Sequence, residues 1–124
     1  RTDAEDIQEG ISRVQDYALA GADAVMVEGL DSKEKIKLVR ESIPSDVSMG
    51  VNLIFGGKMG PISLDELSAL GVNLVIYSTP CLFAAHGAVD NAIRELKENN
   101  GVLKGDEFGV SLAESNKILV SNLK

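Results

Sequence analysis

Apolar residues along the chain form three short runs, and each run ends abruptly in a polar residue. The runs and their polar ends are Ala24–Val27 before Glu28, Met49–Val51 before Asn52, and Leu74–Tyr77 before Ser78 and Thr79. Between the runs, apolar residues recur at the three- and four-residue spacing of amphipathic helices. Short apolar runs that alternate with helices are typical of buried parallel strands. The pattern therefore predicts an α/β fold with a parallel sheet.

Helix and strand signals divide the chain into alternating elements. Predicted helices span residues 6–20, 32–43, 63–70, 80–98 and 111–123, and predicted strands span residues 24–27, 48–53 and 72–77. Ser63 and Glu66 match a capping box at the start of the third helix. Gly21 and Gly71 stand just past the ends of two helices, where a left-handed residue is favoured. Residues 104–109 form a polar linker before the last helix.

The order of the elements indicates right-handed crossovers between parallel strands. Three strands make a poor sheet by themselves, because each edge strand leaves a row of unpaired backbone groups. The segment Arg1-Thr2-Asp3-Ala4 reads like the polar end of a fourth run whose apolar part is absent. We therefore expect the chain to be part of a larger parallel α/β fold.

Composition narrows the classes of partner. The 124 residues include 19 acidic and 12 basic side chains, and the net charge of −7 argues against nucleic acid or an anionic membrane as a partner. No apolar stretch reaches the roughly 18 residues of a membrane helix, and no signal-peptide pattern is present. The one cysteine, Cys81, fits a reducing, cytoplasmic compartment, and we interpret it as a small core residue.

Arg1, Glu28 and Asn52 are candidate site residues, because they stand at the ends of apolar runs and parallel α/β folds carry their chemistry at the carboxyl ends of strands. Arg1 offers a planar fork of donors for a substrate carboxylate, although spacing alone favours a solvated terminal arginine. Glu28 ends an apolar run, where a carboxylate is costly unless it is paired or faces a wet cleft. Such a carboxylate can orient a hydroxyl, hold a metal-bound water or act as a general base, or it can be structural.

Two further features lie near the end of the second predicted strand. Asn52 interrupts an apolar run, so its amide requires polar partners, either a ligand or a neighbouring loop. The following loop contains Gly56-Gly57-Lys58, which suits an anion-binding nest or a plain flexible loop. His86 is expected to be a surface or packed structural residue. The sequence contains no metal-ligand cluster, no Ser-His-Asp set and no nucleotide-binding fingerprint.

Taken together, five segments resemble the C-terminal half of the isocitrate lyase/phosphoenolpyruvate mutase superfamily. They are Arg1-Thr2-Asp3-Ala4, Ala20-Gly21-Ala22-Asp23-Ala24, Val27-Glu28-Gly29, Asn52 with Gly56-Gly57-Lys58, and Leu70-Gly71-Val72 with Val75-Ile76-Tyr77. The resemblance is nearest to the methylisocitrate lyase, 2,3-dimethylmalate lyase, oxaloacetate decarboxylase and carboxyphosphonoenolpyruvate phosphonomutase branches. It implies a partial (β/α)8 TIM barrel that holds strands six, seven and eight.

The same resemblance implies a domain organisation and partners. Residues 1–103 would form the C-terminal half of a TIM-barrel catalytic domain, and the missing N-terminal half of the barrel would be a partner. Residues 104–124 would be a linker and a C-terminal helix that packs on a neighbouring subunit. A homodimer or homotetramer is therefore expected.

The resemblance also implies a reaction and a role for each candidate residue. Arg1 would bind and polarise the oxygens of a small carboxylate substrate, and Asn52 and Gly57 would bind the substrate. Glu28 would lie near the reacting oxygen and reach a metal ion through water at most. The implied reaction breaks a carbon–carbon bond in a 2-hydroxy or 2-oxo dicarboxylate, with Mg²⁺ steadying an enolate of pyruvate type. Most Mg²⁺ ligands are expected in the missing half.

The chain departs from the resemblance in its loop. Phe55 stands where many members have a glutamate, and the Thr-Pro pair that often follows the lysine is absent after Lys58. Cys81 does not match the catalytic cysteine of the true lyases. Three alternatives remain: a phosphonomutase acting on phosphorus–carbon bonds, a non-catalytic half-barrel assembly module, and an autonomous small α/β binding domain. The 124 residues alone are expected to be inactive.

Overall fold

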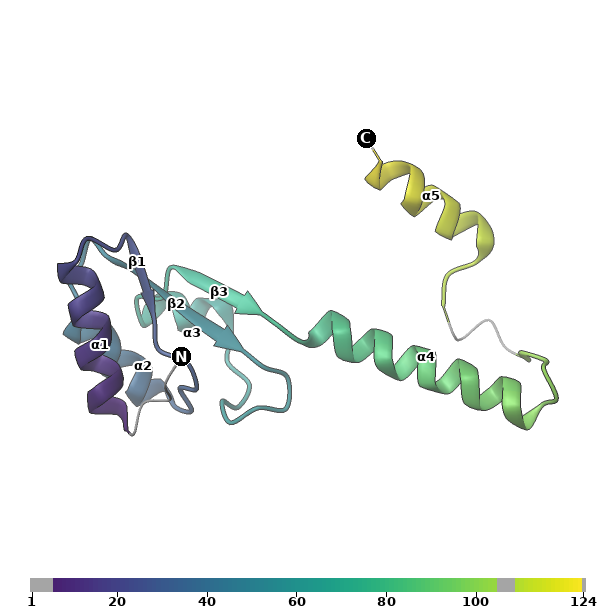
Figure 1. Ribbon diagram of the computed structural model, residues 1–124, viewed down its shortest axis with the longest axis horizontal. Helices are drawn as coiled ribbons and strands as arrows, with labels where there is room; N and C mark the ends of the chain where they lie inside the picture. Colours follow the sequence, from purple (N-terminus) through teal and green to yellow (C-terminus); the bar gives the residue numbers. More distant parts are fainter. Residues whose placement is uncertain (1–5, 105–108, 124) are drawn as a thin grey trace. The chain divides into compact units, whose positions relative to one another are not determined.

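The computed structural model describes residues 6–104 and 109–123, which fold into two compact units divided after Pro80. Its elements are α1 (Ile7–Leu19), β1 (Ala24–Met26), α2 (Lys33–Ser42), β2 (Ser48–Leu53), α3 (Leu64–Ala69), β3 (Leu74–Tyr77), α4 (Pro80–Glu98) and α5 (Leu112–Asn122) (Figure 1). This order confirms the predicted alternation of helices and strands. Arg1 lies outside the described residues, and the predicted domain boundary after residue 103 stays a prediction.

The three strands form one parallel sheet in the order β1-β2-β3. Val25 pairs with Met49, and Val51 pairs with Val75, so each strand is in register with its neighbour. The parallel sheet predicted from the apolar runs is therefore confirmed. Consecutive strands lie side by side, and each connection between them carries a helix.

The third strand begins at Leu74, two residues later than predicted, because a side chain replaces part of the backbone pairing. Asn73 N–H donates to the Met49 carbonyl at 2.9 Å, as a strand residue would. The Met49 N–H, however, donates to the side-chain Oδ1 of Asn73 at 2.9 Å. A side-chain amide thus takes the acceptor place that a backbone carbonyl would hold.

The core lies between one face of the sheet and the helices α1, α2 and α3 (Figure 1). Each helix contributes apolar side chains at helical spacing to this face. Ile36 and Val39 of α2 and Met49 of β2 are fully buried. The whole core comprises Val14, Val25, Ile36, Val39, Ile43, Val47, Met49, Val51, Leu67 and Val72.

The opposite face of the sheet is apolar, and no described helix of the first unit covers it. A Cβ placed on Gly50 would meet Met26 and Leu74 at 3.7 and 3.8 Å, which puts these three residues on the same face. Met26, Leu74 and Ile76 are 38%, 53% and 38% exposed. We call this surface, formed by Met26, Gly50, Leu74 and Ile76, the open face. An apolar face of this kind is unusual on a sheet that meets water.

The second unit consists of α4, α5 and the residues around them. No described residue of either helix is buried. Cys81, which we predicted to be a core residue, is exposed. The prediction was wrong because it relied on apolar neighbours in sequence, and those neighbours are themselves exposed, Leu82 and Phe83 among them.

One arginine holds the turn between α2 and β2. The guanidinium of Arg40 donates to the carbonyls of Val47 at 2.8 Å, Ile43 at 3.1 Å and Pro44. A Cβ on Gly71 would lie 2.9 Å from Cδ of Arg40, so the aliphatic part of the Arg40 side chain packs directly against this glycine. Gly71 has a φ of +78°, as predicted for a residue just past a helix.

Replacing Gly71 should therefore destabilise the protein through two effects. Gly71→Ala adds the strain of a left-handed alanine, about 1 kcal/mol or more, and also pushes the Arg40 stem away from its carbonyl partners. Gly21→Ala is the matched control, because Gly21 has a φ of +94° but open space around its Cβ position. Thermal unfolding of the complete protein should show a larger loss for Gly71→Ala. Equal losses would mean that the Arg40 contact contributes nothing.

The N-terminus of α3 is capped and tied to α2 through one carboxylate. Ser63 N–H and Oγ donate to Glu66 Oε2 at 2.8 and 3.1 Å, and Ser63 Oγ accepts from Glu66 N–H, which confirms the predicted capping box. Lys33, the first residue of α2, donates to Glu66 Oε1. The hydrogen bond from Lys33 and then those from Ser63 lower the pKa of Glu66 from 4.5 to about 2.

This lowered pKa predicts a specific loss of stability in acid. The folded-state pKa of Glu66 lies below its unfolded value, so its stabilising effect is present above pH 4.5 and is lost as the pH falls toward 2. Glu66→Gln should therefore flatten the dependence of unfolding on pH in this window. Glu98→Gln, at the exposed end of α4, removes an equal charge as the control. An unchanged pH profile for Glu66→Gln would contradict the interpretation.

Candidate functional site

Three polar side chains meet where the parallel strands end. Glu28 lies two residues after the end of β1, Asn52 is the next-to-last residue of β2, and Ser78 directly follows β3. The side-chain Nδ2 of Asn52 donates to Glu28 Oε1 at 3.0 Å. The hydroxyl of Ser78 donates to Asn52 Oδ1. Hydrogen bonds between side chains thus join the ends of all three strands in one row, which we call the rim row.

The rim row is open to ligands. Glu28 and Ser78 are exposed, and Asn52 is half-buried. An asparagine amide carries two N–H donors, and a carboxylate has two oxygens. Within the described part of the chain, the second N–H of Asn52 and Oε2 of Glu28 make no hydrogen bond. The row therefore presents a donor beside an anionic acceptor, a combination that can bind a carboxylate and accept a hydroxyl proton.

The loop after β2 folds back by a tight turn. Gly57 N–H donates to the Ile54 carbonyl at 2.9 Å, and Gly56 has a φ of +71°, which its lack of a Cβ permits. A Cβ on Gly57 would lie 2.9 Å from that carbonyl. Phe55 N–H donates to Thr79 Oγ1 at 3.1 Å, so the residues after β3 hold the start of this loop.

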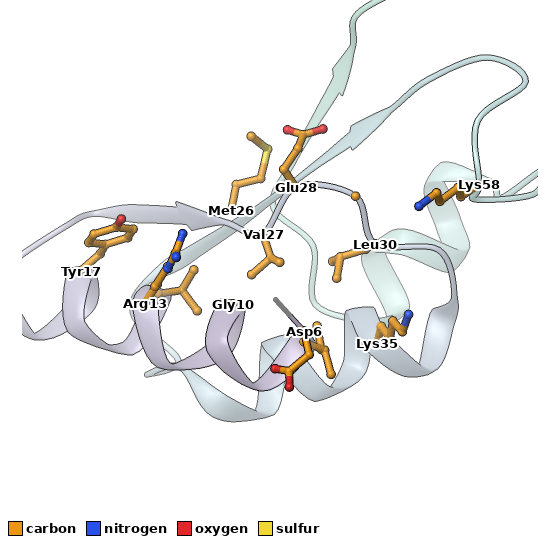
Figure 2. Close-up of a pocket in the computed structure, with 13 residues that line it drawn as sticks. Asp6, Gly10, Arg13, Tyr17, Met26, Val27, Glu28, Leu30, Lys35 and Lys58 are labelled. Atoms are coloured by element: carbon orange, nitrogen blue, oxygen red, sulfur yellow. The ribbon is translucent and has the colours of Figure 1, made fainter. Parts of the chain in front are cut away.

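A cavity of about 490 Å³ lies beside β1 (Figure 2). It is lined by Asp6, Ile7, Gly10, Arg13, Val14, Tyr17, Met26, Val27, Glu28, Gly29, Leu30, Lys35 and Lys58. Met26 and Val27 point to opposite sides of the strand in Figure 2, yet both line the cavity. The cavity therefore runs along the outer edge of β1, the end strand of the sheet. Gly10 allows α1 to approach this edge, since a Cβ there would lie 3.1 Å from Val27.

Two lysines that line this cavity, Lys35 and Lys58, interact with Asp31. Lys35 donates to Asp31 Oδ2 at 2.8 Å, and this hydrogen bond is the main reason that the pKa of Asp31 is lowered. The positive charge of Lys58 lowers the same pKa further, by a smaller effect. Lys35, on α2, and Lys58, in the loop after β2, both line the cavity (Figure 2).

The structure brings together two of the four residues predicted for the site. Glu28 and Asn52 share a hydrogen bond, whereas Gly57 lies in the loop turn and Arg1 lies outside the described residues. Ser78 was not among the predicted site residues, although the end of the third apolar run at Ser78 was the signal that could have found it. His86 is exposed in α4, which agrees with the first of its two expected roles, that of a surface residue.

The described residues do not form a metal site by themselves. Among residues 6–104 and 109–123, no group of three histidine, cysteine, aspartate or glutamate side chains is placed to hold a metal ion. Mg²⁺ takes about six oxygen ligands, usually including one or two carboxylates and several waters. The rim row supplies one carboxylate, that of Glu28, and Oε1 of this carboxylate already accepts from Asn52. In the same residues, no helix is both long and apolar enough to cross a membrane.

Comparison with known proteins places the chain in a family. Residues 1–97 match the family described as phosphoenolpyruvate phosphomutase. The probable 2-methylisocitrate lyase 1 of Corynebacterium glutamicum is 38% identical over 102 residues, which are 80% of this chain and 33% of that protein. The 2,3-dimethylmalate lyase of Eubacterium barkeri is 30% identical over 122 residues, 96% of this chain and 42% of that protein. The chain belongs to the phosphoenolpyruvate mutase/isocitrate lyase superfamily.

Solved structures share its fold. A putative lyase/mutase from Burkholderia cenocepacia matches with a TM-score of 0.75 and 28% identity over 94% of this chain and 40% of that one. A crystal structure of 2,3-dimethylmalate lyase matches with a TM-score of 0.74 and 24% identity over 93% of this chain and 43% of that one. The chain thus spans less than half the length of the relatives it matches, and its α/β fold corresponds to part of theirs.

Proposed function

We propose that this chain is the C-terminal half of a Mg²⁺-dependent lyase that breaks a carbon–carbon bond in a 2-hydroxy or 2-oxo dicarboxylate. The observation that carries the proposal is the hydrogen-bonded pair of Glu28 and Asn52 at the ends of adjacent parallel strands. Relatives named 2-methylisocitrate lyase, 2,3-dimethylmalate lyase and oxaloacetate decarboxylase support the choice of reaction. The compounds in these names each carry at least two carboxylates.

The proposal includes a (β/α)8 barrel in which β1, β2 and β3 are strands six, seven and eight. Three features support it. The strands are parallel and lie in sequential order, as barrel strands do. The open face carries the apolar side chains expected of a barrel interior. β1 is an edge strand of the described sheet, where a strand from the N-terminal half would pair, and that half is therefore a proposed partner.

In the complete site, Asn52 would bind one substrate carboxylate through its second N–H. With a 2-hydroxy substrate, Glu28 would accept the proton of the hydroxyl as its oxygen becomes a carbonyl, whereas a 2-oxo substrate would lose CO₂ without this proton transfer. The electron pair of the broken carbon–carbon bond then passes into an enolate, whose carbon later takes up a proton. Arg1 and Gly57 are proposed to complete the substrate contacts. When bound, Mg²⁺ would supply a Lewis acid for the enolate oxygen, with its ligands mainly in the N-terminal half and Glu28 reaching it through water.

We also propose that the second unit joins a neighbouring subunit in a homodimer or homotetramer. Leu82, Val89, Ile93 and Leu96 follow helical spacing along α4, so they lie on one side of it. All four are between 37% and 61% exposed. A second copy of the chain would cover such a stripe. Light scattering of the complete protein tests this assembly, and a monomer would refute it.

The test of the reaction is an assay of pyruvate release by the complete protein, with Mg²⁺, from 2,3-dimethylmalate, 2-methylisocitrate and oxaloacetate. Glu28→Gln should lower kcat about 100-fold or more, because general-base catalysis contributes at least that much. Asn52→Ala should raise KM, because it removes the carboxylate donor. Glu41→Gln, an exposed carboxylate of α2 outside the rim row, is the control. Chelation of the metal should abolish turnover, and the 124 residues alone should show none.

Two alternatives predict different outcomes. A phosphonomutase would convert phosphonates and leave the diacids intact, a possibility supported by a relative named carboxyvinyl-carboxyphosphonate phosphorylmutase from Arabidopsis thaliana, 30% identical over 93 residues. A non-catalytic half-barrel module would bind its complementary half and turn over neither class of substrate. Cleavage of phosphonates alone, or activity that survives Glu28→Gln, would contradict the lyase proposal.

A further inference from the structure

The hydroxyl of Ser78 is positioned to control the side chain of Asn52. Ser78 follows β3, and its Oγ–H donates to Oδ1 of Asn52 in the neighbouring strand. Neither residue is close to the other in sequence, so the parallel register of β2 and β3 creates the contact. Ser78 is exposed, and the core residues do not include it. A contribution to the core therefore does not explain this hydrogen bond.

The chemistry of the rim row allows only one orientation of the Asn52 amide. An ionised carboxylate accepts hydrogen bonds but cannot donate them. Asn52 must therefore turn its NH₂ group toward Glu28, and it does so at 3.0 Å. Its carbonyl oxygen then faces Ser78, whose hydroxyl can serve as the donor. The three groups form a chain of donors that runs from Ser78 through Asn52 to Glu28.

Without the hydroxyl of Ser78, only one side of the amide would be held. Rotation of the amide by half a turn would set Oδ1 of Asn52 against the carboxylate of Glu28, which repels it. Smaller rotations would move both N–H donors, because the terminal torsion of asparagine has a broad energy well. The hydrogen bond from the Ser78 hydroxyl restricts this torsion, because it holds Oδ1 of Asn52 on the side away from Glu28.

We propose that Ser78 is a positioning residue that fixes the amide of Asn52, and through it the carboxylate of Glu28, for the substrate. The inference rests on the proposed function, because it assigns Ser78 a role in that same site. Ser78 needs no contact with the substrate. With one N–H of Asn52 committed to Glu28 and Oδ1 committed to Ser78, the second N–H has a single direction in which to meet a carboxylate.

The residue after Ser78 makes a similar contact. Thr79 Oγ1 accepts from Phe55 N–H at 3.1 Å, just beyond the end of β2. The segment after β3 therefore holds β2 and its loop at two adjacent points, one on the side chain of Asn52 and one on the backbone of Phe55. Both contacts place restraint on the same end of β2, where the substrate would bind.

The experiment compares Ser78→Ala with Ser78→Thr in the complete protein, using the diacid that is cleaved fastest. Ser78→Ala should lower kcat/KM about three- to tenfold, the value of one net hydrogen bond, and part of the loss should be a higher KM. Ser78→Thr keeps the hydroxyl and should restore most of the activity. The melting temperature should not change, because Ser78 is exposed. Ser68→Ala on α3 removes an exposed hydroxyl away from the rim row as the control.

A double-mutant cycle tests whether Ser78 acts through Asn52. In an Asn52→Ala background the amide is gone, so Ser78→Ala should cause no further loss of kcat/KM. Losses that multiply in the double variant would overturn the inference, and so would failure of Ser78→Thr to restore activity. Ser78→Cys keeps the size of the side chain with a weak donor, and it serves the same comparison if Ser78→Ala does not fold.

The outcomes separate this inference from the proposed function. A complete protein that cleaves no diacid refutes the lyase proposal and the role of Ser78 with it. A complete protein that cleaves diacids, depends on Glu28 and Asn52, and is unaffected by Ser78→Ala refutes the role of Ser78 alone.

Discussion

The in-register parallel pairing of β1, β2 and β3 is the constraint on which the rest of this structure depends. Parallel strands that start together also end together, so their C-terminal residues meet at one edge of the sheet. Residues 28, 52 and 78 are far apart in sequence, and the register alone brings them into hydrogen-bonding range. A slip of one residue in β2 would turn Asn52 to the helical face and bury its amide in the core. The same slip would expose Met49, which is fully buried.

The apolar core therefore secures the polar rim row. Met49 and Val51 pack against the helices on one face, and the pleat then forces Asn52 to the other face. Asn73 strengthens the same register, because its side chain accepts from Met49 N–H at the start of the strand pair. Chemistry at the end of the sheet thus depends on packing several residues away. This coupling explains how exposed side chains acquire a defined geometry without being buried themselves.

Much of this arrangement could be predicted from the sequence, because the signals involved are local. The apolar run of β2 and the spacing of Ser63 and Glu66 each depend on neighbouring residues. The contact between Ser78 and Asn52 could not be predicted in the same way, since it requires the register of two strands. The prediction for Cys81 failed for a related reason: apolar neighbours in sequence do not reveal whether another element covers them. The polar end of each run predicted Glu28 and Asn52 as candidates, but not the hydrogen bond between them.

The open face links the stability of the sheet to the completion of its site. Met26, Leu74 and Ile76 are already about half buried or more, so covering each of them completely contributes about 0.5–1.5 kcal/mol, roughly half the value for a fully exposed side chain. The same side of the sheet carries Glu28 and Asn52 at its rim, with Glu28 and Met26 on one side of β1 (Figure 2). A polypeptide that covers the open face would therefore also lie next to the rim row. A lower dielectric there would strengthen the hydrogen bonds between Ser78, Asn52 and Glu28. Burial of the open face would then drive both folding and the formation of the site. The apolar residues of the open face and the polar residues of the rim row therefore act together.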